Sequence, residues 1–248
     1  MLCVASALAG WIDAVVGGGG LLQLPALLIG LPHLPPAYAL GTNKAVSVVG
    51  TSAAAVTYVR KAPVDVRLAS RLGVVAALSS VGGAFLAAGV NSAVLRPLIM
   101  VLLLGVAAFV VLRPQFGQTP GGATTRARVL AVFGVAGVGI GFYDGLLGPG
   151  TGTFLVIALV ALLNMDMVTA SATTKVVNVC TNIGALAMFT WQGTVLWKLA
   201  ALMALFNMTG GLVGAHMALK RGSGFVRVVL LVTVVGLVGK LAYDQWWS

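Results

Sequence analysis

Two lysines lie within long apolar stretches of this chain, and each ends a short polar motif. Lys44 ends the string GTNK, and Lys175 ends the string ATTK. Ammonium, amide and hydroxyl groups gathered on one face of a helix can donate several hydrogen bonds to one anion. After each lysine, polar residues recur at offsets of three and seven, which places them on the lysine's face of a helix: Ser47 and Thr51, and Asn178 and Asn182.

These polar stripes also have a simpler interpretation. In membranes, Ser, Thr and Asn side chains often hydrogen-bond one helix to the next. The lysines favour a functional site, because an ionisable residue within a membrane span is costly and usually marks a pathway.

An aspartate precedes a glycine-rich break in each half of the chain. Asp13 lies four residues before the string GGGG at 17–20, and Asp144 lies four residues before the string GPGTG at 148–152. Broken backbone at membrane depth is tolerated only where it is buried in protein or lines a wet cavity. A helix that resumes after such a break points free amides and its positive dipole end at the break, which suits an anion. Close helix packing is the alternative role for these glycines.

The roles of the two aspartates stay open at this stage. Each aspartate can neutralise the lysine of its own half. Alternatively, a desolvated carboxyl can take up and release a proton and so couple transport to the proton gradient.

The candidate substrate site combines both breaks with both lysine motifs, and Asp13 and Asp144 stand beside it. Its residues are Gly18, Gly19, Gly20, Leu21, Thr42, Asn43, Lys44, Gly150, Thr151, Gly152, Thr153, Thr173, Thr174, Lys175 and Asn178.

No metal or cofactor is expected. The two histidines and two cysteines are far apart in the sequence, with no ligand spacing.

The elements that must position these residues are membrane helices. Apolar residues make up 59% of the chain and charged residues only 8%, and the mean hydropathy is +1.05, so we expect an all-α, multi-pass membrane protein. The expected spans are 37–58, 68–90, 93–112, 129–147, 168–190, 199–219 and 225–243. In addition, two longer apolar stretches, 1–31 and 129–163, are each cut by a glycine-rich break.

A shift of 131 residues places Asp13 on Asp144 and Lys44 on Lys175 without a gap. The chain is therefore expected to be a duplication. We expect a first membrane repeat at 1–112, a cytoplasmic linker at 113–128 and a second membrane repeat at 129–248.

The loop charges indicate how the two repeats are oriented. Basic residues favour the cytoplasmic side. The loop with Arg60 and Lys61 is then inside, whereas its counterpart at 191–197 has no basic residue, and the next loop carries Lys220 and Arg221. This reversal favours inverted repeats with three full spans per half and a broken segment that is re-entrant or made of two short helices, giving 8–10 membrane segments. The rival arrangement has four spans per half in parallel orientation.

Several spaced strings resemble the sulfite exporter TauE/SafE family of membrane transporters. They are GWID at 10–13, GGGG at 17–20, LP at 24–25, GTNK at 41–44 and RKAPVD at 60–65. The resemblance covers almost the whole chain and implies a permease for small sulfur-containing or organic anions, such as sulfite or sulfonates, commonly in the export direction. The second copy departs from the pattern, since it lacks the Leu-Pro pair and has Leu196 where the first copy has Asp65.

We therefore expect a secondary transporter in the cell (inner or plasma) membrane, which moves a small anion by alternating access around a central site. Protons or another ion are candidate coupling partners. An anion channel with the same site is the alternative.

An enzyme is not expected, because the chain has no Glu and no Ser-His pair or metal-binding constellation. Nucleic acid is not expected as a partner either, because the net charge of +10 is dispersed among loops. The oligomeric state, a homodimer included, is left open.

Overall fold

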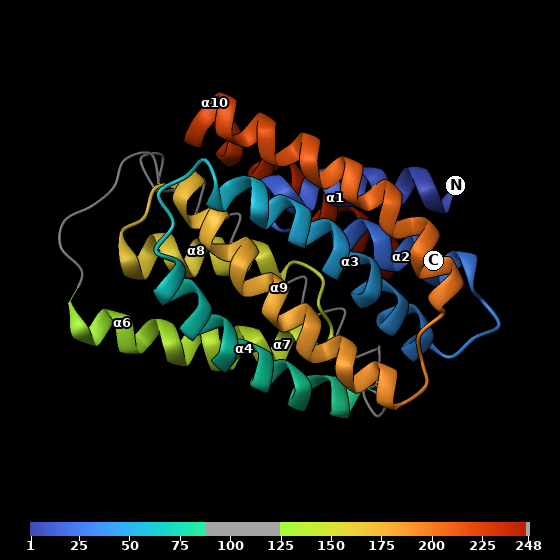
Figure 1. Ribbon diagram of the computed structural model, residues 1–248. Coiled ribbons are helices and arrows are strands. Elements are labelled where there is room, and N and C mark those ends of the chain that lie inside the picture. Colours follow the sequence, from blue (N-terminus) through green and yellow to red (C-terminus); the bar gives the residue numbers. More distant parts are fainter. Residues whose placement is uncertain (88–124, 247–248) are drawn as a thin grey trace.

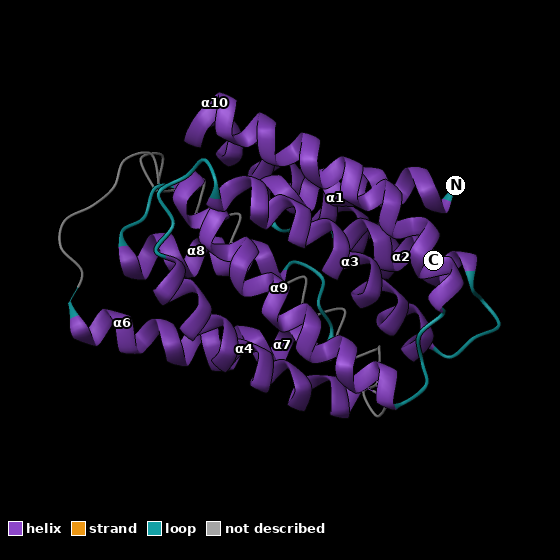
Figure 2. Cartoon of the chain, in the orientation of Figure 1, coloured by secondary structure: helices purple, strands orange, loops and turns teal. Residues whose placement is uncertain are grey.

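The computed structural model describes residues 1–87 and 125–246, and these residues form helices joined by short loops, with no strand among them (Figure 2). The expected span at 93–112 and the linker up to residue 124 lie outside the described residues.

The first glycine break divides the N-terminal stretch into two helices. Helix α1 (Leu2–Val16) ends at Gly17, whose φ of 79° is left-handed and whose amide donates to the Asp13 carbonyl. Helix α2 (Gly20–Gly30) then begins. A β-carbon at Gly30 would lie 3.3 Å from a Leu2 methyl carbon, so α2 runs back along α1. The two helices form an antiparallel hairpin.

The second break builds a matching hairpin. Its first arm is a continuous rod of α6 (Arg126–Val132), the π-helical segment η2 (Phe133–Ile140) and α7 (Gly141–Leu146). Its second arm, α8 (Thr151–Leu163), packs back against α6 and η2. The Tyr143 hydroxyl donates to the Pro149 carbonyl at 2.6 Å and closes the turn between the arms.

Longer helices surround the two hairpins. They are α3 (Pro36–Val59), α4 (Val66–Leu86), α9 (Met167–Trp191) and α10 (Trp197–Trp246), the last kinked at Gly222. Asp65 caps α4 by accepting from the Leu68 amide at 3.0 Å, and Asp166 caps α9.

Among the described residues, three helical stretches are long and apolar enough to cross a membrane: Val66–Leu86, Arg126–Leu146 and Trp197–Thr233. Helices α3 and α9 are longer than the first two of these but carry the polar stripes.

Each hairpin packs against the other half of the chain. Helix α1 lies along α10, and α7 lies along α4. A β-carbon at Gly83 would lie 2.0 Å from the Phe142 carbonyl oxygen, and one at Gly214 would lie 2.6 Å from the Trp11 carbonyl oxygen. The 131-residue shift converts one of these contacts into the other, so the packing of the two halves is reciprocal.

The two hairpins meet tip to tip in the centre of the molecule. Figure 1 shows the first extending toward the end where the N-terminus lies and the second toward the opposite end, where α6 begins. The Thr153 hydroxyl donates to the Val16 carbonyl at 3.0 Å and joins the tips. Helices α3 and α9 pass beside this junction and pack against each other.

Candidate functional site

Two buried ion pairs connect the halves at the hairpin tips. Lys44 Nζ on α3 lies 2.7 Å from Asp144 Oδ2 on α7, and Lys175 Nζ on α9 lies 3.1 Å from Asp13 Oδ2 on α1. Of the roles left open for the aspartates, pairing with the lysine of the same half is not what the structure has, because each aspartate lies against the lysine of the other half. The reason is the reciprocal packing, which brings each hairpin to the lysine helix of the other half.

The polar stripes of α3 and α9 supply further partners to these charges. Lys44 Nζ donates to Asn182 Oδ1 at 3.2 Å. Thr51 Oγ1 donates to Asp13 Oδ2 at 3.1 Å, and Lys175 also donates to the Asp13 carbonyl. The two stripes thus face each other, with each lysine close to the end of the opposite stripe.

The two pairs are not equally enclosed. The side chains of Lys44 and Asp144 are 2% and 4% exposed, whereas those of Lys175 and Asp13 are 0% and 18% exposed. Asp13 is thus the carboxylate that reaches free space most readily.

A small polar space lies between the two breaks and the two stripes. Its volume is about 20 Å³, which is enough for roughly one water molecule. An oxyanion therefore fits only if the tips or the lysine helices move apart. The space is lined by Asp13, Gly17, Gly20, Asn43, Lys44, Ser47, Asp144, Gly148, Thr151, Gly152, Asn178 and Asn182.

The structure brings part of the predicted set together around this space. From the first half these are Gly20, Asn43 and Lys44. From the second half they are Thr151, Gly152 and Asn178.

Four lining residues were not in the predicted set. The polar stripe and the 131-residue pairing already pointed to all of them in the sequence. They are Gly17, Ser47, Gly148 and Asn182.

Other predicted residues of the first half lie elsewhere. Gly18 and Leu21 line a separate apolar groove between α1, α2 and α10, and the Leu21 amide donates to the Gly18 carbonyl at 3.1 Å. Gly19 packs against the Ala9 carbonyl of α1. The Thr42 hydroxyl accepts from the Leu196 amide at 3.1 Å.

The remaining predicted residues of the second half lie just behind the space. Gly150 is the N-cap of α8, and Thr153 is bonded to the first tip. Lys175 is fully buried behind Asp13. Thr173 and Thr174 are fully or almost fully buried on α9.

Several of these buried polar groups lack a protein partner. Within the described part of the chain, no hydrogen bond reaches Thr173 Oγ1, Thr174 Oγ1, Asn43 Oδ1 or Asn178 Oδ1. Buried polar atoms of this kind are uncommon and usually imply a water or a ligand. The centre is thus richer in polar groups than packing alone requires.

No group of three or more His, Cys, Asp or Glu residues in the described ranges is arranged to hold a metal ion. The chemistry gathered at the centre is that of ammonium, amide and hydroxyl donors with two carboxylates.

The fold and this centre define a class of protein. Apolar helices enclose two broken segments and buried charges, an arrangement that is typical of multi-pass membrane transport proteins. Residues 2–241 match the family described as Sulfite exporter TauE/SafE, so the chain belongs to that family. The resemblance of the sequence strings is thereby confirmed.

Similar curated proteins carry transporter names. A probable membrane transporter protein, ORF9, of a Sinorhizobium species is 35% identical over 243 residues, which cover 98% of this chain and 92% of that protein. A probable membrane transporter protein of Haemophilus influenzae is 32% identical, over 100% of this chain and 95% of the relative. The protein YfcA of Escherichia coli K12, with the same description, is 31% identical over 99% and 90%. No solved structure matches the chain.

These findings support a multi-pass membrane transporter, and the family and relatives are named as transporters rather than enzymes.

Proposed function

We propose that the protein is a secondary transporter that exports a small anion, of the sulfite or sulfonate type, through the centre where the hairpins meet. The observation that carries this proposal is the pair of reciprocal, buried Lys–Asp contacts at the two tips. Each contact contains a lysine ammonium group with which an incoming anion can pair.

The anion would compete with the aspartates for the lysines. With the carboxylates in place, each lysine charge is neutralised inside the protein, where an unpaired charge is costly. An oxyanion that takes the place of one carboxylate restores the neutral balance, provided that this carboxylate turns away or accepts a proton. In the absence of substrate, the aspartate carboxylates then pair with the lysines in place of the substrate's anionic group.

A sulfite or sulfonate group suits the donors around the centre. Its oxygens can accept hydrogen bonds from Lys44 and from the amide groups of Asn43 and Asn178. The family name supplies the sulfur-containing class of anion, and the small central space favours a compact one.

Alternating access would follow from the opposed hairpins. Each hairpin is packed on the long helix of the other half, α1 on α10 and α7 on α4. If these packed units rock about α3 and α9, one tip separates from the centre while the other stays closed. The described helices favour the inverted arrangement of the repeats, because the hairpins point in opposite directions (Figure 1).

Asp13 is the candidate for proton coupling. It is the more exposed of the two aspartates, and its carboxylate accepts hydrogen bonds from both Lys175 and Thr51. A proton on Asp13 would weaken its hold on Lys175 and leave that ammonium group for the anion. Export of one anion would then be linked to movement of one proton.

The test is a panel of anions added to the purified protein at two pH values. Sulfite, sulfate, thiosulfate, methanesulfonate and acetate are compared by the shift that each produces in Tm. We expect sulfite or methanesulfonate to give the largest shift. Because methanesulfonate keeps one charge across the pH range, a pH dependence of its effect reports protonation of the protein. Equal shifts for all five anions would refute a sulfur-selective site.

A further inference from the structure

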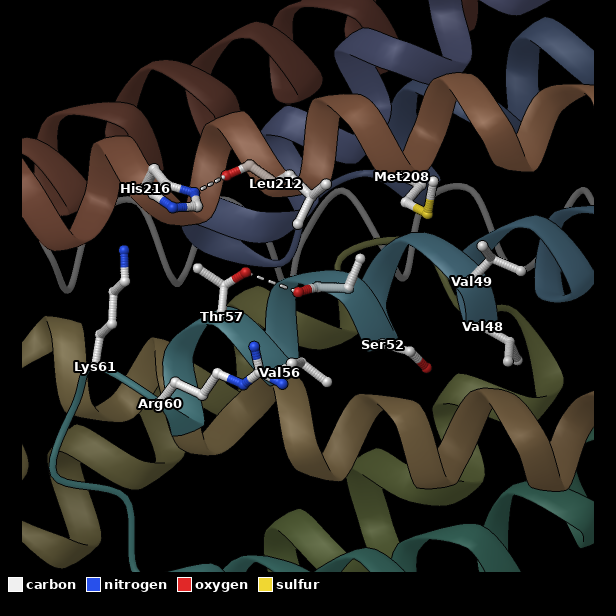
Figure 3. A pocket seen from close by; sticks show the side chains of 11 residues that line it. Val48, Val49, Ser52, Val56, Thr57, Arg60, Lys61, Met208, Leu212 and His216 are labelled. Atoms are coloured by element: carbon white, nitrogen blue, oxygen red, sulfur yellow. Dashed lines mark hydrogen bonds between the residues drawn. The ribbon is translucent and has the colours of Figure 1, made fainter.

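A groove on the outer surface, between α3 and α10, is separate from the central space. Its volume is about 770 Å³, within the range of pockets that hold sizeable ligands. Figure 3 shows α3 and α10 passing on either side of it, with Lys61 and His216 at one end and the Arg60 side chain extending from the same end toward Val56.

The groove is apolar along most of its length. Its walls carry Val49, Val56 and Leu212, which are 39%, 50% and 37% exposed, and Met208. The Thr57 hydroxyl is turned onto its own helix, where it donates to the Ala53 carbonyl at 2.9 Å. From Val48 to Arg60 the groove follows α3 for about 18 Å, a length suited to an extended hydrocarbon chain.

Three basic side chains line this end of the groove: Arg60, Lys61 and His216. Arg60 and Lys61 are exposed and form no ion pair within the described ranges. Asp65, the nearest acid along the chain, is engaged in capping α4. One ring nitrogen of His216, Nδ1, is held by the Leu212 carbonyl at 2.8 Å, so the other nitrogen is left for an outside partner. A phosphate group would meet two charges and a ring nitrogen here.

The second half of the chain offers an internal comparison. The 131-residue shift places Trp191 and Gln192 on Arg60 and Lys61, and Phe85 on His216. It also places Gly184 and Ala77 on Ala53 and Met208, which line the groove. At this second position α9 and α4 come so close that a β-carbon at Gly184 would lie 2.4 Å from the Ala77 carbonyl oxygen.

The larger side chains and the basic residues therefore occur together in one copy only. The rule that loops on the cytoplasmic side are basic accounts for Arg60 and Lys61. It does not account for a widened apolar groove that leads to them, nor for His216 on a different helix.

We infer that the groove between α3 and α10 binds an anionic phospholipid of the cytoplasmic leaflet, with its phosphate at Arg60, Lys61 and His216 and an acyl chain along Val49 and Val56. A basic pocket between membrane helices on the cytoplasmic side is the kind of site that lipid headgroups occupy. The long apolar wall selects a lipid over a free anion.

The experiment measures lipid binding to the full chain in detergent by native mass spectrometry. Dioleoyl phosphatidylglycerol, dioleoyl phosphatidylcholine and inorganic phosphate are added separately. We expect phosphatidylglycerol to be retained in preference to phosphatidylcholine. The double variant Arg60→Gln/Lys61→Gln should weaken its binding by about five-fold for each charge removed. The matched control is Arg126→Gln/Arg128→Gln, which removes two exposed basic residues that do not line the groove.

A second variant tests the apolar wall. Val56→Trp fills the groove at a half-exposed position, and it should reduce phosphatidylglycerol retention while the charges stay in place. Equal retention in both test variants and the control would overturn the inference, as would equal retention of the two lipids.

Two other occupants would also overturn it. Retention of inorganic phosphate equal to that of phosphatidylglycerol would indicate a free-anion site. A lipid-free dimer that Val56→Trp converts to a monomer would indicate that a second copy of the chain covers the groove.

Discussion

Buried charge is the central feature at the scale of single residues. Lys44 and Lys175 are almost completely enclosed, and each has one aspartate of the other half as its counter-ion. Removing one partner of a buried pair leaves an uncompensated charge, whereas removing both partners is much less costly.

Asp144→Asn should lower the free energy of unfolding by about 3–5 kcal/mol, because Lys44 then stays buried without its counter-ion. Asp13→Asn should cost less, since Asp13 is more exposed and retains Thr51 as a partner. Thermal or denaturant unfolding in detergent measures both. The double variant Lys44→Met/Asp144→Leu should recover most of the lost stability. If Asp144→Asn alone were as stable as the unmodified chain, the pair would not be a buried ion pair.

Asn43→Ala should reduce the anion-induced shift in Tm without a large loss of basal stability, because it removes one amide from the lining of the centre. Lys44→Met/Asp144→Leu should abolish the shift, since it removes both the lysine ammonium group and the carboxylate that the anion would replace. Lys198→Ala, in the first turn of α10 and outside the lining of the centre, is the matched control and should keep the full shift. Unchanged shifts in both test variants would remove α3 from the anion site.

The residue pairs could be predicted only in part. The 131-residue shift identified Asp13, Asp144, Lys44 and Lys175 as a set. It could not show that the pairs cross between halves, because helical periodicity fixes a face and not the neighbour of that face.

The buried link from Asn207 to Gln23 Oε1 and to the Ser6 carbonyl was not predicted either. Asn207 has Ala76 as its counterpart in the first half, so the repeat gave no signal for it.

At the scale of elements, close backbone contact joins each hairpin to the opposite half. The glycine breaks were predicted, and both occur where the glycine-rich strings interrupt the apolar stretches. The helix after the second break begins at Thr151, because the backbone hydrogen bonds of the turn lead directly into the helix. The π-helical segment η2 has no clear sequence signal.

Two adjacent glycines of α4 provide a test of this contact. Gly83→Ala should strongly destabilise the protein and impair transport, because its β-carbon would lie 2.0 Å from the Phe142 carbonyl of the second hairpin. Gly82→Ala should be neutral or slightly stabilising, because its β-carbon would lie 3.9 Å from the Phe142 ring and alanine favours a helix. Unfolding temperature and transport rate are compared for both. Similar effects of the two substitutions would contradict the packing of α7 on α4.

At the scale of the whole molecule, the opposed hairpins and the loop charges favour the same topology, with inverted repeats. The C-terminal end of α3 and the kink of α10 lie at the same end of the molecule as the start of α6 (Figure 1). Lys61, Lys220 and Arg128 belong to these regions, so this end is expected to face the cytoplasm.

Single cysteines in a variant without Cys3 and Cys180 can test the topology. Lys61→Cys and Gly224→Cys should react in intact cells only with a reagent that crosses the membrane. His33→Cys and Trp191→Cys should also react with an impermeant reagent. Gly224→Cys is the decisive position, since labelling there by the impermeant reagent would support parallel repeats and refute the inverted arrangement.

Counterflow in proteoliposomes tests most directly the claim that the centre moves an anion by alternating access. Vesicles are loaded with unlabelled sulfite or methanesulfonate, and uptake of the labelled anion is followed. We expect saturable uptake that internal substrate accelerates and that Lys44→Met/Asp144→Leu abolishes. Uptake that rises linearly with concentration and is unaffected by internal substrate would contradict alternating access and indicate a channel.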